Sequence, residues 1–178
     1  MDRTLTAVSA VILLIGCCTG CGREKLKQAI PNICFMYYSS FDEGSAGGFC
    51  DSSGNYYTIL SADVMSMKLE DLISSYEAGE LENDIKLLKK FDEAELEEAH
   101  MKLRGAVTKG NCELRVPDAL PDVEAPHKYW YGVYYDENDT PVTVELHENQ
   151  CMTDINSANK DINEVYEWFS GNFMNKIK

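Results

Sequence analysis

The chain has 178 residues, a length typical of one globular domain with a short extension. Acidic residues outnumber basic residues by 30 to 16, so the formal net charge is −14. A chain with this charge repels phosphate backbones, which argues against nucleic acid as a partner. Hydrophobic residues make up 44% of the chain, which is enough for a packed core and argues against a disordered protein.

Residues 1–16 have the pattern of a secretory signal peptide. Their uncharged apolar run begins at Thr4 and is shorter than the roughly 20 residues that a membrane-spanning helix needs. The run ends in the tetrapeptide LIGC, whose last residue is Cys17, and this resembles the lipobox of bacterial lipoproteins. The resemblance implies that the Cys17 thiol receives a diacylglyceryl group and that the leader is cut before it. An ordinary buried cysteine is the alternative.

Residues 17–32 are predicted to form a lipidated tether, because small and polar residues follow Cys17. Cys18 and Cys21 have the C-x-x-C spacing of redox and zinc sites. A zinc site needs a second pair of ligands and a thioredoxin-like site needs a strand–helix–strand context, and neither follows here. We therefore interpret these two cysteines as part of the tether, and we assign residues 33–178 to a single globular domain.

The first half of this domain is predicted to contain strands followed by three helices. Residues 32–39 are rich in β-forming side chains, and a turn at 51–55 separates two apolar arms, which indicates a hairpin. Apolar residues then recur at helical spacing. The three helices are predicted over 61–78, 80–91 and 92–104, the last with Asp92 as its N-cap and with Gly105 as its end.

The second half contains the clearest β pattern of the chain. Residues 129–147 alternate on two arms around a turn at 136–140, which predicts a hairpin, and 111–117 reads as a short strand before it. An amphipathic pattern from about 159 to 173 predicts a final helix that docks on the sheet. The order of elements predicts an α+β fold, in which a mostly antiparallel sheet of hairpins packs against about four helices.

Four cysteines remain in the domain, namely Cys34, Cys50, Cys112 and Cys151. An exported domain permits disulfides, and an even number of cysteines is compatible with them. Four cysteines allow three pairings, and their spacing does not choose between these. Free buried thiols are the alternative.

The sequence contains no motif of a known catalytic or metal site. Glu97 and His100 match half of a di-iron helix motif, but no second copy exists. The acidic turns at 51–55 and 136–140 lack the glycine and glutamate of a calcium-binding EF-hand loop, so turn chemistry accounts for them. We therefore predict a protein that is not an enzyme and has neither metal nor cofactor. A hydrolase built around His127 is the weakest alternative.

Aromatic residues of the predicted hairpin suggest one binding surface. Trp130 and Tyr134 share a face of the first arm, and their rings would suit stacking on a sugar. A sheet face covered by a helix uses the same residues as core, and the sequence leaves both interpretations open.

Several segments together resemble small uncharacterised lipoproteins of Gram-positive gut anaerobes: the lipobox, the hairpin YDENDTPVTVEL, the acidic helical middle and the helix INEVYEWFSG. The resemblance implies export and attachment to the outer face of the bacterial cell membrane, without a known activity. Some small tethered lipoproteins bind toxins, and an acidic body suits a basic partner. We expect a non-enzymatic binding module whose partner is a basic toxin or an envelope protein. A binder of cell-wall sugar or another small ligand, through Trp130 and Tyr134, is the alternative.

Overall fold

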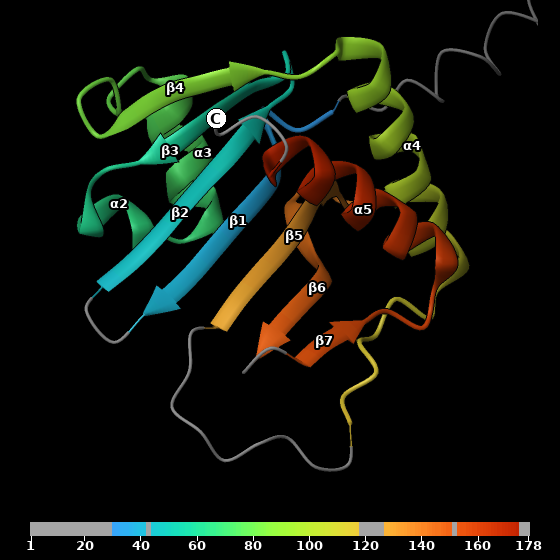
Figure 1. The fold of residues 1–178 in the computed structure, drawn as a ribbon. Helices are drawn as coiled ribbons and strands as arrows, with labels where there is room; N and C mark the ends of the chain where they lie inside the picture. Colours follow the sequence, from blue (N-terminus) through green and yellow to red (C-terminus); the bar gives the residue numbers. More distant parts are fainter. Residues whose placement is uncertain (1–29, 42–43, 118–126, 151–152, 175–178) are drawn as a thin grey trace, which may run out of the picture.

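The computed structural model describes residues 30–41, 44–117, 127–150 and 153–174. It confirms the predicted α+β fold, with one antiparallel sheet of seven strands in the described part of the chain (Figure 1). The strands are β1 (Ile33–Phe41), β2 (Gly44–Asp51), β3 (Asn55–Ile59), β4 (Ile85–Lys90), β5 (His127–Tyr135), β6 (Pro141–Gln150) and β7 (Thr153–Asn156).

The strand order in the sheet is β4-β3-β2-β1-β5-β6-β7. The chain therefore forms two meanders, β1 to β4 and β5 to β7, which join where β1 pairs with β5. At this junction Phe35 lies opposite Gly132. A Cβ atom at Gly132 would come within 2.5 Å of the Leu103 side chain, so glycine lets a helix approach the sheet closely.

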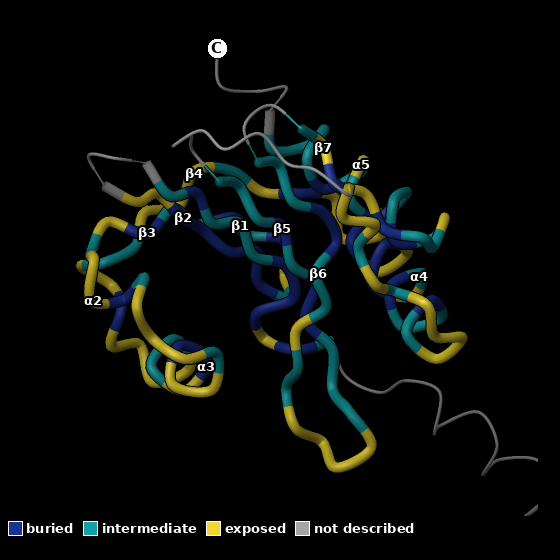
Figure 2. Tube along the Cα trace, turned by 90° about the horizontal axis from the view of Figure 1, so that it is seen from below, coloured by how far each residue is buried: buried dark blue, intermediate teal, exposed yellow. Residues whose placement is uncertain are grey.

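Helices cover both faces of the sheet. They are α2 (Ala62–Met65), α3 (Leu69–Glu77), α4 (Glu93–Lys109) and α5 (Lys160–Met174). On one face, α2 and α3 bury a core that includes Ile33, Phe49 and Leu72. On the opposite face, α4 and α5 bury a second core that includes Phe35 and Phe169 (Figure 2).

The prediction of a helix over 80–91 is wrong, because β4 occupies Ile85–Lys90 and pairs with β3. The apolar residues at 81, 85, 88 and 91 fit a helical period over this short window. However, Leu81 belongs to the core under α3, whereas Phe91 belongs to the core under α5. A single amphipathic helix has one apolar face and cannot fill two cores on opposite sides of a sheet.

Other element boundaries also differ from the prediction. The helix expected over 61–78 is divided into α2 and α3 by residues 66–68. Asp92 is confirmed as an N-cap, since its carboxylate accepts hydrogen bonds from the Ala94 and Glu95 amides. This helix, α4, continues past Gly105 and ends before Gly110, which has a φ of 77°. The strand expected at 111–117 is only an isolated bridge between Leu114 and Ser157.

The last residues assigned to the tether belong to the folded domain. The Asn32 carbonyl accepts a hydrogen bond from the Ser52 amide at 3.2 Å, and Ile30 packs against the core under α4 and α5. The predicted signal peptide and most of the predicted tether, Cys17 included, lie outside the described residues.

Candidate functional site

One region of the sheet carries polar and aromatic side chains that belong to neither core. It lies on the face opposite α4 and α5, where Tyr129 of β5 pairs with Glu148 of β6 and Tyr131 pairs with Glu145. The register shifts between these two pairs. Because the extra residue of a β-bulge leaves the ladder, the two glutamates share a face although they are three positions apart. Between them, Leu146 turns to the core under α5.

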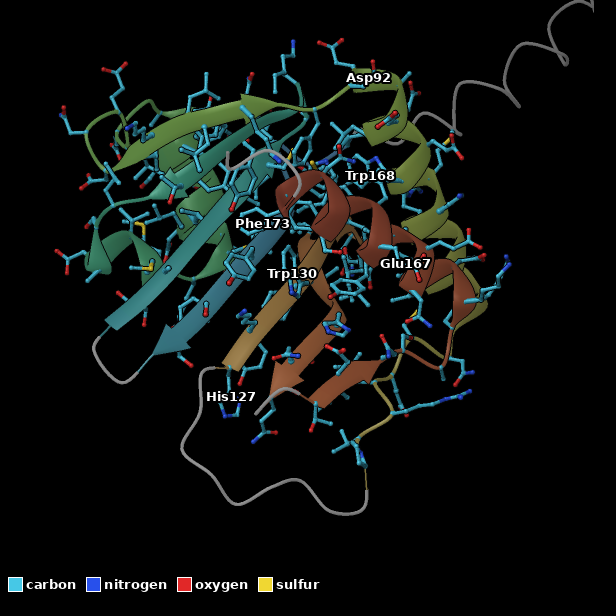
Figure 3. The ribbon with its side chains drawn as sticks, in the orientation of Figure 1. Asp92, His127, Trp130, Glu167, Trp168 and Phe173 are labelled. Carbon is cyan, nitrogen blue, oxygen red and sulfur yellow. The ribbon has the colours of Figure 1, made fainter. Side chains whose placement is uncertain are left out.

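Aromatic rings form a continuous row across this region. His127 stacks on Tyr129 with ring centroids 5.9 Å apart, and Tyr129 stacks on Tyr131 at 6.2 Å. Tyr38 of β1 lies 6.3 Å from Tyr129, ring centre to ring centre. We call Tyr38, His127, Tyr129, Tyr131, Glu145 and Glu148 the tyrosine–carboxylate face. Figure 3 shows His127 at the N-terminal end of β5, which lies away from α4 and α5.

The two carboxylates of this face have different surroundings. An oxygen of Glu148 lies 3.3 Å from Nδ1 of His127, which is itself 3.1 Å from the Tyr129 hydroxyl. The Glu148 side chain is only 17% exposed, so water shields its pairing with His127 poorly. Protonation of the imidazole would turn this contact into an ion pair.

The Glu145 carboxylate has no hydrogen-bond or ion-pair partner among the described residues. Its partial burial and the negative charge of Glu148 raise the pKa of the Glu145 carboxyl above its ordinary value. Burial and the two carboxylates also raise the pKa of the Tyr131 hydroxyl. A positive group placed beside Glu145 would offset its repulsion by Glu148. The faces of the neighbouring tyrosine rings attract cations as well. The arrangement therefore suits an ammonium or guanidinium group.

Trp130 does not provide the stacking platform considered from the sequence. It is only 4% exposed and lies beneath α5, with its ring 5.4 Å from Phe169 and 5.2 Å from Phe173 (Figure 3). Tyr134 lines a separate cavity of about 390 Å³ beside α4, with Arg104 and Val107. The two residues thus share a sheet face, but they lie under different helices and form no common site.

The cysteines form no disulfide among Cys34, Cys50 and Cys112, whose thiols are free in this structure. Cys34 and Cys50 are neighbours on β1 and β2, and their thiols donate to backbone carbonyls: Cys34 reaches the Cys50 oxygen at 3.2 Å. Burial raises the pKa of the Cys34 thiol. The fourth candidate, Cys151, lies outside the described residues. The buried pair therefore serves here as apolar packing.

Two other histidines are structural. Nε2 of His100 donates to the Val133 carbonyl at 3.0 Å, which ties α4 to β5. His147 stacks on Tyr166 at 3.9 Å and lies between Asn156 and Asp154. Glu97 and His100, the two residues of the half-motif, are not part of a metal site. Within the described residues, no three metal-ligating side chains lie close enough together to hold an ion.

Comparisons with known proteins identify no relative: no family model, no curated protein and no solved structure matches the chain. Among the described helices none is both long and apolar enough to cross a membrane. The candidate site therefore stands on its own geometry.

The sequence leaves open which face of β5 is core, and the structure buries the face that carries Trp130. The alternation along β5 separates Tyr129 and Tyr131 from Trp130, but it does not tell which side a helix covers. Tyr38 comes from a strand about 90 positions earlier, and no local pattern links it to β5. The one available signal was the pair of acidic residues on β6, Glu145 and Glu148, opposite tyrosines rather than lysines.

Proposed function

We propose that this protein is a lipid-anchored, extracytoplasmic binding module without catalytic activity, and that it holds a basic protein partner on its tyrosine–carboxylate face. The observation that carries the proposal is Glu145, a half-buried carboxylate with no counter-ion among the described residues, beside the ring of Tyr131. A soluble protein gains nothing from such a group in isolation, because burial of an unpaired charge costs free energy. A lysine or arginine side chain of a partner would supply the missing charge.

The surroundings of Glu145 favour a macromolecular cation over a metal ion. Tyr129 and Tyr131 offer ring faces, which attract ammonium and guanidinium groups by about 0.5–2 kcal/mol. Metal ions such as calcium take six or more oxygen ligands, whereas this face brings two carboxylates. The formal net charge of −14 adds long-range attraction, which speeds the encounter with a basic partner.

Attachment to the membrane is supported by the apolar leader and by the lipobox that ends at Cys17. A diacylglyceryl group at Cys17 would hold the domain close to the outer surface of the membrane, where it meets envelope proteins and incoming basic proteins. A toxin-binding role of the immunity type fits this location, as does binding of a basic envelope protein.

A substitution that removes the negative charge of Glu145 tests the site. The probe is a ten-residue peptide that contains four arginines, and the matched probe replaces the arginines with glutamines. Glu145→Gln should weaken binding of the arginine peptide about ten-fold or more, measured by calorimetry at low and at physiological salt. Glu137→Gln, in the exposed turn of the same hairpin, removes the same charge and should leave the affinity within two-fold. Equal losses of affinity in the two variants would show that the overall negative charge, and not this site, attracts the peptide. That result would contradict the proposal.

A binder of cell-wall sugar is the second candidate, and the row of rings formed by Tyr38, Tyr129 and Tyr131 favours it. Sugar rings stack on aromatic faces without needing a carboxylate. Binding of peptidoglycan fragments that is lost in Tyr131→Ala but kept in Glu145→Gln would support this function instead of the first.

A further inference from the structure

Strand β4 forms one edge of the sheet. It pairs with β3, and no other described strand lies beside it. Its outer row of backbone amides and carbonyls is thus available for another extended segment, as in every unprotected sheet edge. In Figure 1 this strand runs along the side of the sheet furthest from β7.

Strand β4 exposes two leucines at this edge. Leu87 is 53% exposed and Leu88 is 48% exposed. The register of β3 and β4 shifts between Tyr56 and Tyr57, so Leu88 is the extra residue of a bulge. Bulges and lysines protect edges from indiscriminate pairing, but exposed leucines do the opposite. Leu87 and Leu88 thus leave apolar surface uncovered at an edge that can still pair.

A cavity of about 800 Å³ opens next to this edge, between β4 and the end of α3. Leu81, Ile85 and Leu87 line one part of it, and the rings of Tyr57 and Tyr76 line another. The Tyr76 hydroxyl donates to Asp51 at 2.7 Å, which fixes its ring in place. An edge strand beside a pocket is the arrangement by which sheets capture extended peptides, with backbone pairing for affinity and the pocket for side-chain choice.

The charges of β4 restrict the partner. The strand contains Lys86, Lys89 and Lys90 and no acid, although acids dominate the chain. Lys89 lies over the Phe91 ring, whereas Lys86 is exposed and has no ion-pair partner among the described residues. Pairing with β4 of a second copy would set these lysines against each other, which is unfavourable for directly opposed like charges.

We propose that β4 and the adjacent cavity bind an extended peptide segment of another protein, in which apolar and acidic residues alternate. The segment adds an eighth strand to the described sheet by pairing with β4. Its apolar side chains enter the cavity beside Leu87, and its acidic side chains, on the other face, lie near Lys86. This site is independent of the tyrosine–carboxylate face, so either can fail without the other.

Backbone-modified peptides test the pairing directly. The probe is a capped ten-residue peptide of alternating valine and glutamate, titrated into the full-length protein and followed by fluorescence anisotropy and by amide chemical shifts. N-methylation of the amides on one edge of the peptide should abolish binding, since these amides pair with β4, whereas methylation of the other edge should change the affinity less than three-fold. Equal effects of the two methylated peptides, or no binding of the parent at millimolar concentration, would overturn the proposal.

Two substitutions assign the site. Leu87→Glu should weaken binding at least ten-fold, whereas Met101→Glu, at an equally apolar position of α4 that is 61% exposed, should leave it unchanged. A peptide of alternating valine and lysine should bind at least ten-fold more weakly than the glutamate peptide. Equal binding of the two peptides, or shifts confined to Glu145 and its neighbours, would contradict the inference.

Discussion

Acid should unfold this protein partly through His100. The imidazole projects from α4 and is buried against the sheet, where its Nε2 donates to the Val133 carbonyl. Burial lowers the pKa of His100 from 6.5 to about 4, because the charged form loses its hydration. In the unfolded chain the same group titrates near its ordinary value. Below about pH 6.5 the unfolded state therefore binds a proton at this imidazole that the folded state does not bind. The free energy of unfolding falls as the pH drops towards 4.

The expected magnitude follows from the two pKa values. Their difference corresponds to about 3.4 kcal/mol at 1.36 kcal/mol per pKa unit, a limit reached only below pH 4. Linkage gives about 2 kcal/mol lost by pH 5 relative to neutral pH, and about 3 kcal/mol by pH 4. Such losses are a large part of the roughly 5–15 kcal/mol that stabilises an ordinary domain.

Urea denaturation at several pH values between 7.5 and 4.5 measures this loss. In His100→Gln the amide can still donate to the Val133 carbonyl, but it cannot take up a proton. The variant should have a lower free energy of unfolding than the wild type at neutral pH. At pH 5 the difference between the two free energies should be smaller by about 2 kcal/mol. Other titrating groups contribute to both curves alike and cancel in the difference. Parallel curves, or an NMR titration in which the folded-state imidazole charges near pH 6.5, would refute the reasoning.

Other consequences can be measured separately. Cys17→Ser should move the protein from the membrane fraction to the medium or soluble fraction of its host, and unchanged fractionation with an unacylated wild-type residue would contradict lipidation. Trp130→Ala should cost about 3–5 kcal/mol in the free energy of unfolding, since the ring is part of the core under α5. Gly132→Ala should destabilise by about 1–3 kcal/mol because the added methyl meets Leu103, whereas Gly171→Ala, with open space at its Cβ, should be neutral or stabilising by up to about 1 kcal/mol. Calorimetric and urea unfolding of the three core and glycine variants measures these changes in the free energy of unfolding.

The sequence predicts the elements whose signals are local. In the β5–β6 hairpin, alternating residues flank a turn in which the Asp136 carboxylate accepts hydrogen bonds from the Asn138 and Thr140 amides. The start of α4 depends on Asp92, which bonds to amides two and three residues later. Both signals lie within a few positions of the feature that they specify, so one sequence suffices to find them.

The sequence misleads where distant parts of the chain decide the structure. The apolar spacing around β4 fits the period of a helix as well as that of a strand. Pairing with β3, about 30 residues earlier, makes this segment a strand. The candidate site depends on a bulge that no local pattern announces. Strict alternation would place Glu145 and His147 together, but the shifted register sends His147 to the core and brings Glu148 to the open face.

The same bulge explains why the tyrosine–carboxylate face and a core can share two strands. Without it, residues 145 and 147 of β6 would lie together on the open face and Glu148 would point to the core under α5. Glu148 would then leave the face that carries His127, and the contact between these two side chains would be lost. The extra residue instead lets Leu146 and His147 both serve the core, where His147 stacks on Tyr166. The row of tyrosines and carboxylates thus depends on a local irregularity, and bulges of this kind re-aim side chains at functional surfaces.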